Sequence, residues 1–178
     1  MERLSGLDAS FLYAETESAH MHTLKVLVLE LPERARGAAF AYVRRGLEQR
    51  LHVLRPLRFT LAQDPLGVGH PVWVEDPSVA ARAHLEHAVL PRDAENGALE
   101  AAIGAFASVP LSREAPLWKL LVIEGLPDGR VALVIKIHHA LADGSAAARL
   151  MSLVMGEDPP GPPVPQRPRS AYDAPSGP

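Results

Sequence analysis

The residues best suited to chemistry in this chain lie in the string His-His-Ala-Leu-Ala-Asp-Gly at positions 138–144. The string follows an apolar run, 131–137, that predicts a buried strand, and it precedes small and apolar residues, 145–155, that predict a packed helix. A histidine at the end of a buried strand is held rigidly, and an unperturbed pKa of about 6.5 keeps much of it neutral near pH 7. Such a histidine is able to act as a general base on a hydroxyl or an amine.

Asp143 and Gly144 suit the loop that would join this strand to the helix. Asp143 stands where the helix is expected to begin, so its carboxylate is able to cap the helix or to form an ion pair. Gly144 permits a backbone path that a side chain would block. Adjacent strand residues point in opposite directions, so we do not expect His138 and His139 to bind one metal ion. On spacing alone, purely structural histidines remain an open alternative.

The composition excludes several functional classes. The chain has 178 residues, 47% of them apolar, which is enough for one sizeable core. Its 18 Lys and Arg residues against 21 Asp and Glu residues argue against nucleic-acid binding. The absence of cysteine excludes disulfides, cysteine-ligated zinc, iron–sulfur clusters and thiol nucleophiles. We see no secretory signal and no run of about 20 apolar residues, and therefore expect a cytoplasmic protein that touches membranes from one side at most.

The distribution of proline predicts the domain organisation. Eight of the 17 prolines fall within residues 156–178, a density that cannot build helix or sheet and favours an extended spacer. We therefore expect one compact domain over residues 1–155, followed by a proline-rich linker over residues 156–178.

Hydrophobic periodicity and turn signals predict an alternation of strands and helices within the compact region. Pro127 and Gly129 supply turn chemistry between two apolar runs, which indicates a β-hairpin. The expected elements are a buried strand at 24–31, a helix at 38–51, short strands at 57–61 and 71–75, a helix at 98–109, and hairpin strands at 118–124 and 131–137.

Three separated motifs carry a family resemblance. HHALADG matches the His-His-x-x-x-Asp-Gly signature of the CoA-dependent acyltransferase superfamily. Leu-Asp-Ala-Ser-Phe-Leu at 7–12, followed by Met21-His22, and Pro-Leu-Trp at 116–118 resemble the bacterial wax ester synthase/diacylglycerol acyltransferase family. The resemblance covers about residues 4–155. It implies an α/β fold of the chloramphenicol acetyltransferase-like type, a sandwich of mixed sheet and helices that forms one of two similar halves.

The resemblance also implies an activity and roles for residues. The family transfers an acyl group from long-chain acyl-CoA to the hydroxyl of diacylglycerol or of a long-chain alcohol, without an acyl-enzyme, a metal or a further cofactor. His139 falls on the family's general base, His138 on an orienting neighbour, and Asp143 on a carboxylate that pairs with an arginine to hold the loop. Pro116, Leu117 and Trp118 fall on a motif near the acyl-binding region. A strand start with a core tryptophan explains these three residues equally well.

The sequence departs from the family in length, because family members are two-domain chains whose second half carries an Asn-Asp motif that is absent here. We therefore interpret this chain as an N-terminal half that needs a C-terminal half for activity. Its lipid substrates imply peripheral attachment to a membrane or lipid-droplet surface. Two alternatives stay open: a condensation domain of nonribosomal peptide synthesis, which shares the histidine signature, and a non-catalytic lipid-binding half.

Overall fold

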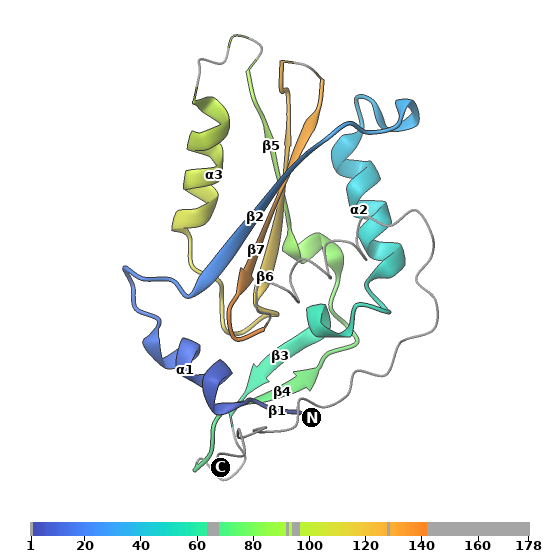
Figure 1. Cartoon of the computed structure of the whole chain (residues 1–178). Coiled ribbons are helices and arrows are strands. Elements are labelled where there is room, and N and C mark those ends of the chain that lie inside the picture. Colours follow the sequence, from blue (N-terminus) through green and yellow to red (C-terminus); the bar gives the residue numbers. More distant parts are fainter. Residues whose placement is uncertain (1, 64–67, 92, 94–96, 128, 142–178) are drawn as a thin grey trace, which may run out of the picture.

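Two β-sheets and three α-helices make up the part of the chain that the structure describes. The computed structural model describes residues 2–63, 68–91, 93, 97–127 and 129–141, and Figure 1 shows the arrangement of the elements. The helices are α1 (Gly6–Ala14), α2 (Ala39–Arg50) and α3 (Ala98–Ser108), with short 3-10 turns at Glu33–Ala35, Arg55–Arg58 and Ala81–His84.

The larger sheet has the strand order β2-β7-β6-β5. Its strands are β2 (His22–Leu29), β5 (Leu85–Val89), β6 (Trp118–Glu124) and β7 (Val131–His138). β6 and β7 form the antiparallel hairpin that the sequence predicts, and Gly129 in its turn has a φ of 75°. β5 runs parallel to β6, whereas β2 pairs antiparallel with β7 and places His22 opposite His138.

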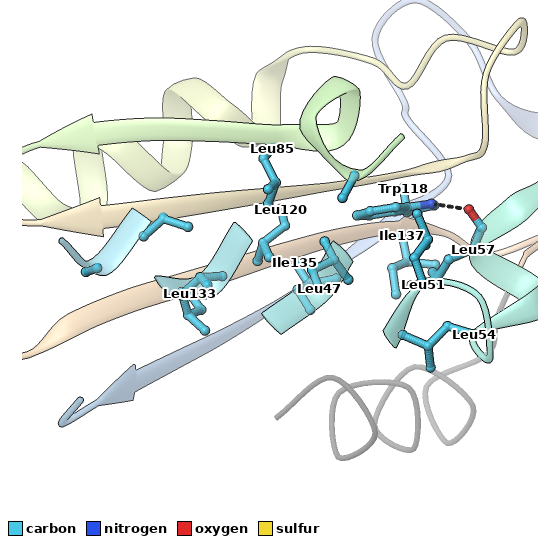
Figure 2. Close-up of a cluster of buried hydrophobic side chains, with 14 of the residues drawn as sticks. Leu47, Leu51, Leu54, Leu57, Leu85, Trp118, Leu120, Leu133, Ile135 and Ile137 are labelled. Carbon is cyan, nitrogen blue, oxygen red and sulfur yellow. Dashed lines mark hydrogen bonds between the residues drawn. The ribbon is translucent and has the colours of Figure 1, made fainter. Parts of the chain in front are cut away.

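Helices cover both faces of this sheet. α2 packs on one face through an apolar cluster that includes Leu47, Trp118 and Leu133 (Figure 2). α3 packs on the opposite face, where Phe106 lies in a second cluster with Val134. Strands that are covered on both faces have near-continuous apolar runs, and β7 fits this rule because all 8 of its residues are buried and only Lys136 and His138 are polar. The strand that ends in the histidine pair is therefore a rigid support.

A buried lysine ties α3 to β7. Lys136 is 2% exposed, and its ammonium donates hydrogen bonds to the carbonyl oxygens of Phe106 at 2.6 Å and Val109 at 2.7 Å. These carbonyls lie at the C-terminal end of α3, where backbone acceptors lack intrahelical partners and where a positive charge is favoured. Burial lowers the pKa of the ammonium from its ordinary value. The contact fixes the end of α3 against the strand that leads into the histidine pair.

The smaller sheet lies at the His138 end of β7 (Figure 1). It has the order β1-β4-β3, and its antiparallel strands are β1 (Glu2–Arg3), β3 (Phe59–Ala62) and β4 (Val72–Glu75). Phe59 and Trp73 of this sheet share a buried cluster with Leu12 of α1, Leu117 and Ala140. This second core packs the N-terminal helix directly against the turn that follows β7.

Several predictions from the sequence are confirmed. The helices predicted at 38–51 and 98–109 are α2 and α3, and the predicted hairpin strands are β6 and β7. The short strands expected at 57–61 and 71–75 are β3 and β4. The fold is the mixed arrangement of sheet and helices that the resemblance implies.

The prediction of a buried strand at 24–31 is wrong in one respect. The strand forms as β2, but within the described residues it lies at the edge of the sheet, and it leaves Val26 45% and Val28 38% exposed. Its continuous apolar run resembles that of a central strand because one side of it packs on the α2 cluster.

Two predictions lie outside the described residues. They are the helix at 145–155 and the proline-rich linker at 156–178, so the division of the chain at residue 155 stays a prediction. Among the helices that are described, none is long and apolar enough to cross a bilayer.

Candidate active site

Backbone hydrogen bonds fix the histidine pair on both sides. His138 is the last residue of β7, and its amide donates to the carbonyl of Leu117 at 3.0 Å. His139 lies in the turn that follows, and its amide donates to the carbonyl of Met21 at 2.8 Å. Leu117 belongs to the Pro-Leu-Trp string and Met21 to the Met-His string. The three motifs that are distant in sequence therefore meet at one place.

His139 presents its ring beside the N-terminal helix. The side chain is half-buried and stacks on Phe11 of α1, with ring centroids 4.9 Å apart and planes at 23°. No described residue forms a hydrogen bond with either nitrogen of the His139 ring. Phe11 lies within the Leu-Asp-Ala-Ser-Phe-Leu string, which gives that string a direct role in orienting the imidazole.

His138 points away from this position into the protein and is 1% exposed. Its Nδ1 accepts a hydrogen bond from the amide of Ala140 at 3.0 Å. Because an amide only donates, the proton of the neutral ring is on Nε2. Burial lowers the pKa of His138 to about 4; the Glu15 carboxylate opposes this effect and the Arg113 guanidinium adds to it. The ring is therefore neutral at pH 7.

A carboxylate and a guanidinium face His138 from the N-terminal helix and from the segment before β6. Glu15 caps the C-terminal end of α1, and one of its oxygens lies 2.9 Å from Nη2 of Arg113. Arg113 also donates to the carbonyl of Leu12. The other carboxylate oxygen, Oε1, lies 3.6 Å from Nε2 of His138. Both of these facing atoms are buried, and neither has a hydrogen-bond partner among the described residues.

His22 completes this group of residues. It begins β2, directly opposite His138 in the strand register. Burial lowers its pKa, and the positive charge of Lys136 lowers it further. Like His138, His22 is therefore neutral at pH 7, which keeps additional positive charge away from the turn that follows β7. In the part of the chain that the structure describes, no group of three or more His, Asp or Glu side chains has the geometry to hold a metal ion.

Pro116, Leu117 and Trp118 lie in the core beside the end of β7. All three are buried, and the indole N–H of Trp118 donates to the carbonyl of Leu57 at 2.8 Å (Figure 2). The indole also stacks on His84 with centroids 4.5 Å apart. These contacts account for the tryptophan as a core residue, and a role of the string in binding the acyl chain stays a prediction.

Asp143 and Gly144 lie outside the described residues. Three residues at the site that are described were not identified from the sequence: Phe11, Glu15 and Arg113. Glu15 directly follows the α1 segment, so its position beside a recognised motif was a usable signal. Arg113 offers no such signal, because its contact with Glu15 spans 98 residues.

The described residues form a mixed sheet that has a helix on each face and ends in a histidine pair, which agrees with the CoA-dependent acyltransferase-like fold that the sequence resemblance implies. Residues 4–176 match the family described as the wax ester synthase/diacylglycerol acyltransferase catalytic domain. The chain therefore belongs to the wax ester synthase/diacylglycerol acyltransferase family.

Two relatives illustrate this membership. A Mycobacterium tuberculosis protein named for diacylglycerol O-acyltransferase activity is 44% identical over 152 residues, which is 85% of this chain and 32% of that protein. The wax ester synthase/diacylglycerol acyltransferase of Marinobacter aquaeolei has a solved structure with a TM-score of 0.73 and 32% identity, covering 85% of this chain and 36% of that one. The chain thus spans about a third of the length of these relatives.

The starter condensation domain of rhizomide synthetase is similar in fold alone. Its TM-score is 0.63 at 19% identity, over 86% of this chain and 36% of that one. This similarity shows that condensation domains and this chain share a fold.

Proposed function

We propose that this chain is the histidine-bearing half of an O-acyltransferase that moves an acyl group from acyl-CoA to a lipid hydroxyl. The acceptor is the hydroxyl of diacylglycerol, which gives triacylglycerol, or that of a long-chain alcohol, which gives a wax ester. The observation that carries the proposal is the placement of His139: its ring stacks on Phe11, its backbone amide donates to the Met21 carbonyl, and its ring nitrogens form no hydrogen bond with a described residue. The family membership supplies the reaction class.

In the proposed reaction His139 acts as a general base. A neutral imidazole nitrogen accepts the proton of the acceptor hydroxyl while that oxygen attacks the thioester carbonyl of acyl-CoA. The new C–O bond forms, the C–S bond breaks, and the imidazolium returns the proton to the departing CoA thiolate. The products are the ester and free CoA. No acyl-enzyme is required, and the chain has no cysteine to form a thioester intermediate.

The neighbouring residues have supporting roles in this proposal. His138 faces the interior and orients the turn through the Ala140 amide, so it is not a second base. Asp143 holds the loop by pairing with an arginine, in the way that the family resemblance implies. Pro116, Leu117 and Trp118 border the acyl-binding region, and acyl-CoA is a substrate rather than a resident cofactor.

A second half of similar fold completes the site in this proposal. Two observations support it: the relatives are about three times as long as the matched region, and the edge strand β2 exposes Val26 and Val28. An exposed apolar edge is a surface that proteins usually cover. We use the term complete enzyme for this chain combined with a C-terminal half, either as one polypeptide or as two chains that copurify.

The test is acyl transfer by the complete enzyme. Labelled long-chain acyl-CoA is supplied with diacylglycerol or with a long-chain alcohol, and the lipid product and the released CoA are quantified together. We expect equal amounts of ester and CoA. Release of CoA without ester would indicate thioester hydrolysis, and a stable complex that transfers to neither acceptor would support a non-catalytic lipid-binding role; either result refutes the proposal.

The lipid substrates further imply work at a membrane or lipid-droplet surface. The chain lacks a polybasic run, so we expect attachment through apolar side chains rather than through anionic lipid. The test is cosedimentation of the complete enzyme with neutral and anionic vesicles at low and high salt. Binding that requires anionic lipid or disappears at high salt would contradict apolar attachment.

A further inference from the structure

The general-base mechanism leaves one pair of charged residues beside His138 unused. Glu15 and Arg113 form an ion pair, and Oε1 of Glu15 lies 3.6 Å from Nε2 of the buried His138 ring. Glu15 comes from the end of α1 and Arg113 from the segment between α3 and β6, so two distant parts of the chain converge on this ring.

The contact between Glu15 and His138 has the form of an incompletely closed hydrogen bond. Nε2 of His138 carries a proton, because Nδ1 accepts from the Ala140 amide. This N–H faces Oε1 of Glu15 at 3.6 Å, and neither atom has another partner among the residues described. A shift of about half an ångström would bring the two atoms to hydrogen-bond distance. Hydrogen bonds at catalytic sites are often long without substrate and tighten in the complex.

The carboxylate is itself held in place. Its second oxygen lies 2.9 Å from Arg113, which also donates to the Leu12 carbonyl of α1. The guanidinium is half exposed and the carboxylate is 11% exposed, so the pair presents its buried end to the histidine. A continuous set of contacts therefore runs from Arg113 through Glu15 and His138 to the amide of Ala140, the residue that follows His139.

We propose that Glu15 is a positioning residue, whose carboxylate accepts the Nε2–H of His138 and thereby fixes the turn that presents His139 to the substrates. The proposal rests on the acyl transfer proposed above. Glu15 touches no reacting atom in this role, because it acts through the His138 ring and the Ala140 amide. Arg113 serves the same purpose one step further away by holding the carboxylate.

The first test compares Glu15→Gln with Glu17→Gln in the complete enzyme. Glu17 is exposed and lies two residues away, so its variant removes the same charge outside the contact. We expect Glu15→Gln to lower kcat by about 10-fold to 100-fold with KM changed less than 2-fold, because misplacing a base impairs reaction more than binding. Glu17→Gln should match the unmodified enzyme. Equal kinetics for the two variants would overturn the proposal.

A double-mutant cycle separates positioning from general structural support. If Glu15 acts through His138, the loss in kcat for Glu15→Gln combined with His138→Gln should be far smaller than the product of the two single losses. Losses that multiply would show that Glu15 acts independently of His138, and would refute the proposal. Where Glu15→Gln does not fold, Glu15→Asp carries the same test, since it keeps the charge and shortens the reach by one carbon.

A spectroscopic measurement on the 178-residue chain tests the contact without reference to activity. The His138 Nε2 proton should give a downfield proton NMR resonance, coupled to ring nitrogen, which moves upfield in Glu15→Gln and not in Glu17→Gln. A resonance that has the same chemical shift in Glu15→Gln and in the unmodified chain would refute the contact between Glu15 and His138. The complete enzyme could transfer no acyl group while the resonance still depends on Glu15. This result would refute the proposed function and the positioning role of Glu15, but it would confirm the hydrogen bond between Glu15 and His138.

Discussion

Burial of His138 makes a quantitative prediction for folding stability at low pH. The ring is 1% exposed, and burial holds its pKa at about 4 in the folded chain, against about 6.5 in an unfolded one. Between pH 6.5 and pH 4, His138 is protonated in the unfolded chain but remains neutral in the folded chain. The free energy of unfolding therefore falls as the pH falls from 6.5 to 4. This lowering of the His138 pKa corresponds to about 3 kcal/mol of unfolding free energy. The folded chain has this full contribution above pH 6.5 and loses it as the pH falls to 4.

The assay is urea unfolding at steps from pH 7 to pH 4, followed by the fluorescence of the buried Trp73 and Trp118. In His138→Gln the titrating ring is gone, so the variant should lose about 3 kcal/mol less than the unmodified chain over this range. His84, whose pKa burial also lowers, acts equally in both proteins and cancels in the comparison.

The matched control is His52→Gln, because His52 is exposed. It should keep the pH dependence of the unmodified chain. Identical pH profiles for His138→Gln and the unmodified chain would refute the claim that a neutral buried ring supports the turn.

Two further substitutions test the contacts that hold β7 and His139. Lys136→Met leaves the two carbonyls at the end of α3 without a donor and should cost about 2 kcal/mol of unfolding free energy, measured by urea unfolding. The control Lys25→Met on β2 should cost less than about 0.5 kcal/mol. Equal costs for the two variants would contradict the role of Lys136 at the end of α3. Phe11→Leu removes the ring that stacks on His139 and should lower kcat of the complete enzyme by about 2-fold to 10-fold. The control is Phe40→Leu in α2, which removes a comparable stack on His87 of β5 and should leave kcat unchanged. Equal kcat values for the two variants would contradict the orienting role of Phe11.

Elements with local signals were predictable from the sequence. The β6–β7 hairpin carries its signal in two apolar runs around Pro127 and Gly129, and Gly129 has the positive φ that this turn requires. α2 carries its signal in the spacing of Val43 and Leu47, both of which are buried. In each case a few neighbouring residues determine the element, so the local sequence pattern is sufficient to predict it.

The start of α1 also carries a local signal. Ser5 caps α1, since its side chain accepts a hydrogen bond from the amide of Asp8, a spacing that typifies a helix start. The family motif at 7–12 does not by itself predict a helix. The structure shows that this helix carries Phe11 and ends at Glu15, which explains why the motif accompanies the histidine pair.

The remaining features depend on contacts between distant segments. The strand β5 is only 5 residues long and has two adjacent polar residues, Glu86 and His87, so it lacks the pattern of a strand and is stabilised by parallel pairing with β6. The ion pair of Glu15 with Arg113 forms only because α1 and the segment before β6 pack against the same turn. Periodicity and spacing describe neighbours along the chain, so neither feature is visible in them.

The central claim is that His139, and not His138, is the base, and the most direct measurement is the acyl-transfer rate of His139→Ala in the complete enzyme. His139 is half-buried and its ring has no hydrogen-bond partner among the described residues, so the variant should fold with an unchanged melting temperature. Its transfer rate should fall by about 10²-fold to 10⁴-fold, the usual contribution of a general base. A folded His139→Ala enzyme that transfers acyl groups at the unmodified rate would contradict the account.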